Sequence, residues 1–225
     1  MTAVSRWLQK NLAYQFRVAA HLEQALTHRS AGSDHNERLE FLGDAVLGML
    51  ISERLYLALP EADEGYLSRL RAHLVRRETL AEVGNEIGLG EWLKLGPGEL
   101  KSGGYRRASI IANGLEAVLG AIYLDGGVES VGKAIDVLFE SRLRNLPCQD
   151  DLKDPKTRLQ EILQGRAIDV PVYVVEEMSG ESHKRHFTVS CSIPALDRRT
   201  TANGRSRRSA EQSAAAEMID LLGND

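Results

Sequence analysis

The chain has 225 residues, of which 43% are hydrophobic, and it carries a formal net charge of −4. This size fits one large or two small globular domains. Residues 1–153 and residues 154–225 each contain more Asp and Glu than Lys and Arg, which excludes a protein that binds nucleic acid through bulk positive charge. Any nucleic-acid binding must therefore come from local basic patches.

Cysteine use and hydropathy indicate the compartment. Cys148 and Cys191 match no metal-ligand spacing and imply no disulfide framework. Residues 1–10 lack the long apolar core of a signal peptide. Polar or charged residues interrupt each apolar run before it reaches the length of a membrane span. These features predict a soluble cytoplasmic protein with no membrane partner.

The first 146 residues are predicted to be helical, with no strand. Apolar residues recur there at helical spacing, and Gly and Pro separate the periodic segments. The expected helical segments are 5–12, 20–26, 37–58, 66–88, 108–124 and 128–144. The short polar segment 147–153 has the composition of a linker.

Beyond the linker, the pattern changes to a helix, strands and a second helix. The expected elements are a helix over 155–166, strands over 172–175, 187–193 and 198–203, and a helix over 207–222. Three strands with two helices on one side make an α+β layer fold. The predicted fold class is mainly α: an all-helical N-terminal domain followed by a small α-β-β-β-α domain.

The most informative segment lies within the helix expected over 37–58. Glu37, Glu40 and Asp44 fall on one narrow stripe of this helix, opposite its apolar side chains. Three like charges side by side repel each other, and a hard divalent cation with oxygen ligands would relieve that repulsion. A solvated acidic face is the alternative, and spacing alone favours neither interpretation.

Phe41 lies near Glu37 on the same helical wheel, so a large apolar side chain is placed among the acids. This arrangement suggests a surface that meets a partner subunit. The alternative is a Phe buried within its own chain.

More candidate ligands lie on a second helix. Asn113 and Glu116 are one turn apart in the segment 108–124. If the two helices face each other, Glu40 and Asp44 could meet Glu116, because carboxylates on opposed helices commonly build metal sites in bundles. Spacing does not show which helices touch.

Several motifs resemble those of the ribonuclease III family. The run Asn36–Val46, which reads NERLEFLGDAV, resembles the family signature. Residues 63–65 resemble its second acidic segment, and 95–104 followed by 115–117 resemble its third. Residues 154–223 are similar to a double-stranded-RNA-binding domain. The resemblance covers nearly the whole chain, in the order that the family has.

This resemblance implies magnesium-dependent cleavage of double-stranded RNA, with 5′-phosphate and 3′-hydroxyl ends, in the processing of structured precursors such as rRNA and mRNA. Mn²⁺ could substitute for Mg²⁺, and no organic cofactor is expected. The implied organisation is an endonuclease domain over 1–146, a linker over 147–153 and an RNA-binding domain over 154–225. The resemblance also implies a homodimer in which Phe41 inserts into a pocket of the twofold-related subunit.

Matching positions in the family motifs give the expected roles in catalysis. Glu40, Asp44 and Glu116 resemble metal ligands, and Asp44 and Glu116 are also expected to be catalytic. Glu37 and Glu64 resemble acidic residues that line the RNA cleft, with less direct catalytic roles.

Asn113 stands where the family usually has an aspartate ligand, and its amide oxygen could bind the metal without adding negative charge. Three explanations stay open: a natural variant that cleaves, an engineered substitution that blocks cleavage, or a double-stranded-RNA-binding protein with impaired cleavage. A metal hydrolase acting on another phosphoester would explain the acids but not the second domain.

Three surfaces of the second domain suit an RNA duplex, whose minor groove is shallow and flanked by phosphates. They are the polar side of the helix over 155–166, the segment 180–183, and the basic start of the helix over 207–222, where backbone amides favour phosphate. The expected RNA contacts are Thr157, Gln160, Glu161, His183, Ser206, Arg207 and Arg208. Ser209 and Glu211 stand where many relatives carry Lys or Arg, which predicts a modest RNA affinity. A polar helix face that is merely solvated is the alternative.

Overall fold

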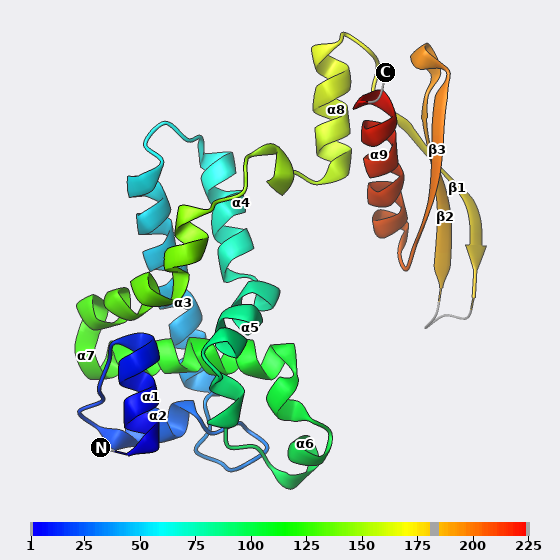
Figure 1. The fold of residues 1–225 in the computed structure, drawn as a ribbon. Coiled ribbons are helices and arrows are strands. Elements are labelled where there is room, and N and C mark those ends of the chain that lie inside the picture. The colour runs from blue at the N-terminus through cyan, green and yellow to red at the C-terminus, as the bar shows by residue number, and fades with distance from the viewer. Residues whose placement is uncertain (1, 181–184, 224–225) are drawn as a thin grey trace. The chain divides into compact units, whose positions relative to one another are not determined.

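The computed structural model describes residues 2–180 and 185–223 of the chain (Figure 1). It divides into two compact units, Met1–Pro147 and Cys148–Asp225. Each unit has its own hydrophobic core.

The N-terminal unit is helical, as predicted. Its α-helices are α1 (Ala3–Leu12), α2 (Ala19–Ala25), α3 (Glu37–Ala58), α4 (Glu64–Val75), α5 (Arg77–Glu86), α6 (Pro97–Lys101) and α7 (Ala108–Arg144). Short 3₁₀ turns lie at Leu89–Glu91 and Gly104–Arg106. A parallel bridge between Thr27 and Lys94 ties the loop before α3 to the segment before α6.

Helix α7 forms the centre of this unit and packs against α3. It is one continuous helix except at Gly127, where φ is 77° and ψ is −177°. Glycine tolerates this positive φ because it has no Cβ. The break separates the two segments that the sequence predicted, 108–124 and 128–144.

By length and composition, α7 is the one helix in the described part of the chain that could cross a membrane. Of its most apolar 18-residue window, 61% is buried inside the protein. Such burial is expected of the central helix of a globular unit.

The single helical segment predicted over 66–88 is wrong. The structure has two helices there, α4 and α5, because Arg76 adopts an extended conformation with ψ of 153°. The buried Thr79 hydroxyl donates a 2.7 Å hydrogen bond to the carbonyl of His73, across the break. This side chain thereby satisfies a carbonyl group that the end of α4 leaves without a helical partner.

In the C-terminal unit, two helices lie on one face of an antiparallel sheet, as predicted (Figure 1). The elements are α8 (Pro155–Gly165), β1 (Val172–Ser179), β2 (His186–Ile193), β3 (Arg198–Gly204) and α9 (Arg207–Gly223). The strand order is β1-β2-β3, with a bulge in β1 between Val175 and Glu177. The core includes Leu159 and Leu163 of α8, Cys191 and Ile193 of β2, and Met218 of α9.

Candidate functional site

Two glycines bring the backbones of α3 and α7 into direct contact. A Cβ built on Gly43 of α3 would lie 1.8 Å from the carbonyl oxygen of Glu116 on α7. A Cβ on Gly120 of α7 would lie 2.3 Å from the carbonyl oxygen of Leu39 on α3. No side chain fits at either position, so the helices approach as closely as their main chains allow. Gly43 directly precedes Asp44, so this contact places the acidic stripe of α3 beside α7.

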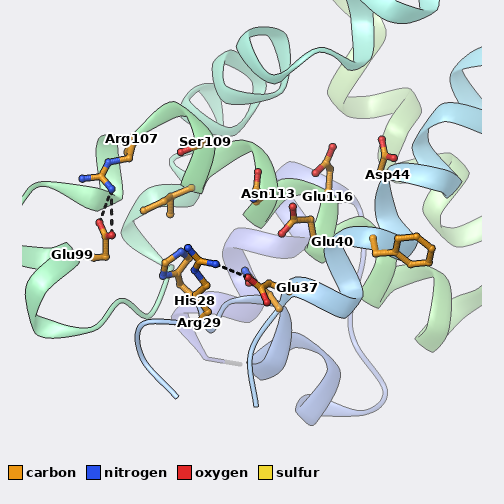
Figure 2. Close-up of a pocket in the computed structure, with 13 residues that line it drawn as sticks. His28, Arg29, Glu37, Glu40, Asp44, Glu99, Arg107, Ser109, Asn113 and Glu116 are labelled. Carbon is orange, nitrogen blue, oxygen red and sulfur yellow. Dashed lines mark hydrogen bonds and ion pairs between the residues drawn. The ribbon is translucent and has the colours of Figure 1, made fainter. Parts of the chain in front are cut away.

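Side chains of α3 and α7 line a cavity of about 590 Å³. Its lining includes six residues singled out from the sequence: Glu37, Glu40, Phe41, Asp44, Asn113 and Glu116. Figure 2 shows Glu40, Asn113 and Glu116 at one end of the cavity, with Asp44 beside them. The two helices therefore face each other in the way that spacing alone could not establish.

Negative charge is concentrated at this end of the cavity. Burial and the nearby Asp44 and Glu40 carboxylates raise the pKa of Glu116 to about 7, and only Arg77 opposes this. Burial also raises the pKa of Glu40, together with the charges of Glu37 and Asp44, while a hydrogen bond from Asn113 and the charge of Arg29 partly offset these effects. A divalent cation would neutralise this charge, and carboxylate and amide oxygens are ligands that Mg²⁺ prefers. The donor set therefore fits a hard cation.

The other carboxylates of the cavity are balanced by arginines. Glu37 accepts from Arg29 at 3.2 Å, and Glu99 accepts from Arg107 at 3.0 Å. Figure 2 shows these pairs away from Glu116, with His28 next to Arg29. The cavity thus has an acidic end and an end where each carboxylate is paired with an arginine.

Glu64 stands apart from the acidic end, whereas Phe41 lines the same cavity as the acids. Glu64 lies at the start of α4, accepts a 2.7 Å hydrogen bond from Ser68, and lines a separate cavity with Tyr56 and Arg71. Phe41 is 80% exposed at the cavity wall, so the alternative that it is buried within its own chain is wrong. Within residues 2–180 and 185–223, no three His, Cys, Asp or Glu side chains are already arranged to hold a metal ion.

In the C-terminal unit, the predicted RNA contacts lie on α8 and at the start of α9. Thr157, Gln160 and Glu161 are exposed on α8, where Glu161 pairs with Lys153. Ser206, Arg207 and Arg208 are also exposed, and the Ser206 hydroxyl accepts from the backbone N–H of Ser209 in the first turn of α9. His183 lies outside the described residues. Thr157, Gln160 and Arg208 line a single cavity of about 650 Å³.

Comparison with known proteins decides the family. The model of the ribonuclease-III-like family matches residues 20–142, and that of the double-stranded RNA binding motif matches residues 155–222. Ribonuclease 3 of Vibrio parahaemolyticus is 52% identical over 217 residues, which cover 96% of each chain. Ribonuclease 3 of Photobacterium profundum is 52% identical over 222 residues, or 99% of each chain. The chain belongs to the ribonuclease III family.

Solved structures of this family agree with the N-terminal unit. The nuclease domain of ribonuclease III from Campylobacter jejuni matches with a TM-score of 0.61 and 37% identity, covering 65% of this chain and 100% of that chain. A second structure of that domain, described for flexibility in its region of dimer formation, gives a TM-score of 0.57 and 39% identity over 60% of this chain and 95% of that one.

Family membership establishes the activity. The protein is an endoribonuclease that cleaves double-stranded RNA, and its C-terminal unit binds the duplex. The predictions of family, fold class and enzyme class are therefore confirmed. Members of this family are generally metal-dependent. A hydrolase of some other phosphoester does not account for the RNA-binding motif.

The residues that position the site are not among those that the sequence predicts. Gly43 and Gly120 set the distance between the acid-bearing helices, and Arg29 balances Glu37. For Gly43 and Gly120 the sequence does hold a signal, because a glycine inside an otherwise regular apolar helix often marks close backbone approach. The Arg29–Glu37 pair has no such signal, since it depends on how the loop before α3 folds.

Proposed function

We propose that this ribonuclease cleaves double-stranded RNA with Mg²⁺ bound at the acidic end of the α3–α7 cavity, and that Mn²⁺ can replace it. Glu40, Asp44, Asn113 and Glu116 would hold the ion, with Asp44 and Glu116 as the catalytic ligands. The observation that carries this proposal is the crowding of three carboxylates, which raises the pKa of Glu116 to about 7. Mg²⁺ usually takes one or two protein carboxylates and completes its shell with waters and phosphates, so a full protein shell is not required.

When bound, Mg²⁺ activates water for attack and neutralises the scissile phosphate. The chain's own residues have separate tasks. Gly43 and Gly120 fix the spacing of the carboxylates, so their charge is preorganised before the substrate arrives. Glu37 would orient Arg29 toward the RNA backbone rather than bind the ion, because its charge is already balanced. The products would carry 5′-phosphate and 3′-hydroxyl ends.

Asn113 determines how strongly the ion binds in this proposal. It lines the same cavity as Glu40 and Glu116, and its amide lowers the pKa of the Glu40 carboxyl, partly offsetting the effect of burial. It adds no negative charge, so Mg²⁺ should bind more weakly than in the Asn113→Asp variant. Ligand charge is one of the factors that set the affinity of hard cations.

The test is a Mg²⁺ titration of duplex cleavage by the chain with Asn113 and by its Asn113→Asp variant. We expect the half-saturating Mg²⁺ concentration to fall on the order of tenfold in the variant, which corresponds to about 1.4 kcal/mol. Asn85→Asp makes the same chemical change at an exposed position on α5 and should leave the titration unchanged. If Asn113→Asp also leaves it unchanged, Asn113 is not a ligand.

The same titration tests one alternative function. The alternative is a protein that binds double-stranded RNA but cleaves it poorly, and the amide of Asn113 in place of an aspartate ligand supports it. Cleavage that is absent in the chain with Asn113 at saturating Mg²⁺, and restored in Asn113→Asp, would support that alternative.

We also propose a homodimer in which Phe41 inserts into a pocket of the second subunit, with one active centre in each copy. An 80% exposed Phe beside the acidic end of the cavity supports an interface there. The related nuclease domain from Campylobacter jejuni has a region involved in dimer formation. Exposed aromatic side chains of this kind commonly anchor subunit interfaces.

The proposed RNA interface uses both helices of the C-terminal unit. Thr157, Gln160 and Glu161 would contact the minor groove, while Ser206, Arg207 and Arg208 would contact phosphate. The natural substrates would be structured precursors such as rRNA and mRNA in the cytoplasm. The double variant Arg207→Ala plus Arg208→Ala should weaken duplex binding and lower its salt dependence by about one unit of slope per lost contact.

A further inference from the structure

Glu211 of α9 is an acid in the basic segment of the RNA-binding unit, where its charge would be expected to repel the duplex. The structure does not leave this charge on the surface. The carboxylate accepts from Lys156 Nζ of α8 at 2.7 Å and from Arg207 Nε of α9 at 2.8 Å. Only 8% of Glu211 is exposed. It therefore joins one cation from each helix.

Lys156 is held from a second side as well. Its Nζ lies 4.5 Å from the centre of the Tyr173 ring on β1, within the range of a cation–π contact. The side chains of Lys156 and Arg207 remain 36% and 66% exposed. Both cations are therefore fixed in place and still accessible to a ligand.

The position of Lys156 connects it to the proposed RNA interface. It lines the 650 Å³ cavity together with Thr157, Gln160 and Arg208. The sequence predicts RNA contacts for those three residues but none for Lys156.

The charges of this cluster leave a positive excess. Burial raises the pKa of Glu211, but the hydrogen bonds and charges of Lys156 and Arg207 outweigh it and lower the pKa below its usual value. One carboxylate faces two cations, so Glu211, Lys156 and Arg207 together carry one net positive charge, while Asp154 and Arg208 on the same cavity lining offset each other. A lysine has three N–H donors and an arginine has five, so both retain donors for a phosphate oxygen.

We propose that Glu211 is a positioning residue for RNA binding and that Lys156 is a further phosphate-binding residue. Glu211 and Tyr173 hold Lys156 in place, and Glu211 holds Arg207, so that both cations are ordered before the duplex arrives. Long side chains lose rotamer freedom when they bind, and ordering them in advance reduces that cost. The inference rests on the proposed contact between Arg207, Arg208 and phosphate.

The Glu211→Gln variant separates this role from simple repulsion. If Glu211 only repelled RNA, removal of its charge would strengthen binding. Positioning predicts the opposite: binding about fivefold weaker, and a salt slope lower by about one, the value expected for one lost phosphate contact. The measurement is fluorescence anisotropy of a labelled RNA duplex with the full chain, across a salt series in EDTA to prevent cleavage.

Glu217→Gln is the matched control. It removes the same charge from an exposed position on the same helix, and it should leave affinity unchanged or slightly raised. Lys156→Gln changes a partly exposed side chain and should lower the salt slope by about one even if Glu211→Gln impairs folding. In a Lys156→Ala plus Arg207→Ala background, Glu211→Gln should have no further effect, because its coupling partners are gone.

The positioning role would be overturned if the Glu211→Gln variant binds the duplex as tightly as the unsubstituted chain, or more tightly, with an unchanged salt slope. Unchanged binding by Lys156→Gln would overturn the phosphate contact. If either result occurs while Arg207→Ala plus Arg208→Ala still weakens binding, the inference fails and the proposed RNA interface stands. If that double variant has no effect, the interface itself is wrong.

Discussion

The Gly43→Ala variant tests whether backbone contact between α3 and α7 sets the active site. The added methyl group would lie 1.8 Å from the carbonyl oxygen of Glu116, whereas ordinary contact begins at 3.4 Å. The helices must therefore separate locally by about 1.6 Å. That movement takes Glu40 and Asp44 away from Glu116.

Both stability and activity should respond. Overpacking a close contact typically costs about 1–3 kcal/mol. For a unit of this size, the midpoint of thermal unfolding should fall on the order of 5 °C. Misplacing a catalytic group by about 1 Å can reduce the rate roughly 10²-fold, so duplex cleavage should fall far more than stability does. Duplex binding in EDTA should be largely retained, because the RNA-binding unit is a separate compact unit.

Gly48→Ala is the control on the same helix. A Cβ at Gly48 meets nothing within 4 Å. Replacing an unstrained helical glycine by alanine usually stabilises a protein by about 0.4–1 kcal/mol. We expect a slightly higher unfolding midpoint and unchanged cleavage. If Gly43→Ala cleaves and unfolds like Gly48→Ala, then the close approach does not position the carboxylates.

Two further predictions concern the interface and acid stability. Phe41→Asp should make the protein monomeric in sedimentation. A Phe buries roughly 150–250 Å², and at about 25 cal/mol per Å² this burial stabilises the dimer by several kcal/mol per copy. If the variant stays dimeric, Phe41 does not lie in the interface. Asp125→Asn should cost about 2 kcal/mol in urea unfolding at pH 7, since the Asp125 carboxylate accepts from Tyr14 Oη and from the backbone N–H of Arg17 and Val18 at 2.7–2.9 Å. Burial raises the pKa of Asp125, but these hydrogen bonds lower it below 3.8 overall. The ionised Asp125 carboxylate therefore stabilises the fold above pH 3.8, and this stabilisation is lost as the pH falls through the lowered pKa. The difference between the two proteins should therefore shrink as the pH falls below 3.8, and a constant difference would contradict this reasoning.

The sequence predicted the helices well where one face is buried. The segment 37–58 coincides with α3, because its apolar stripe packs on α7 and the periodic pattern records that burial. The break at Arg76 was missed because no Gly or Pro marks it. It depends on Thr79 meeting the carbonyl of His73, a contact that exists only once both helices have folded.

The acidic residues of the site could be proposed from sequence, but their grouping could not. Periodicity places Glu40 and Asp44 on one stripe, and it places Asn113 and Glu116 one turn apart. It cannot show that the two helices meet, nor that Glu64 lines a different cavity. Both facts depend on tertiary packing, which the spacing of residues along one helix does not encode.

The enclosed carboxylate of Glu211 also bears on how the isoelectric point of such a protein is interpreted. The calculated value of about 5.9 gives every charge the same weight, whatever its surroundings. The Glu211 carboxylate lies between Lys156 and Arg207, so an approaching polyanion meets a cluster with one net positive charge at this place. An acidic average over the whole chain is thus compatible with a surface that attracts RNA.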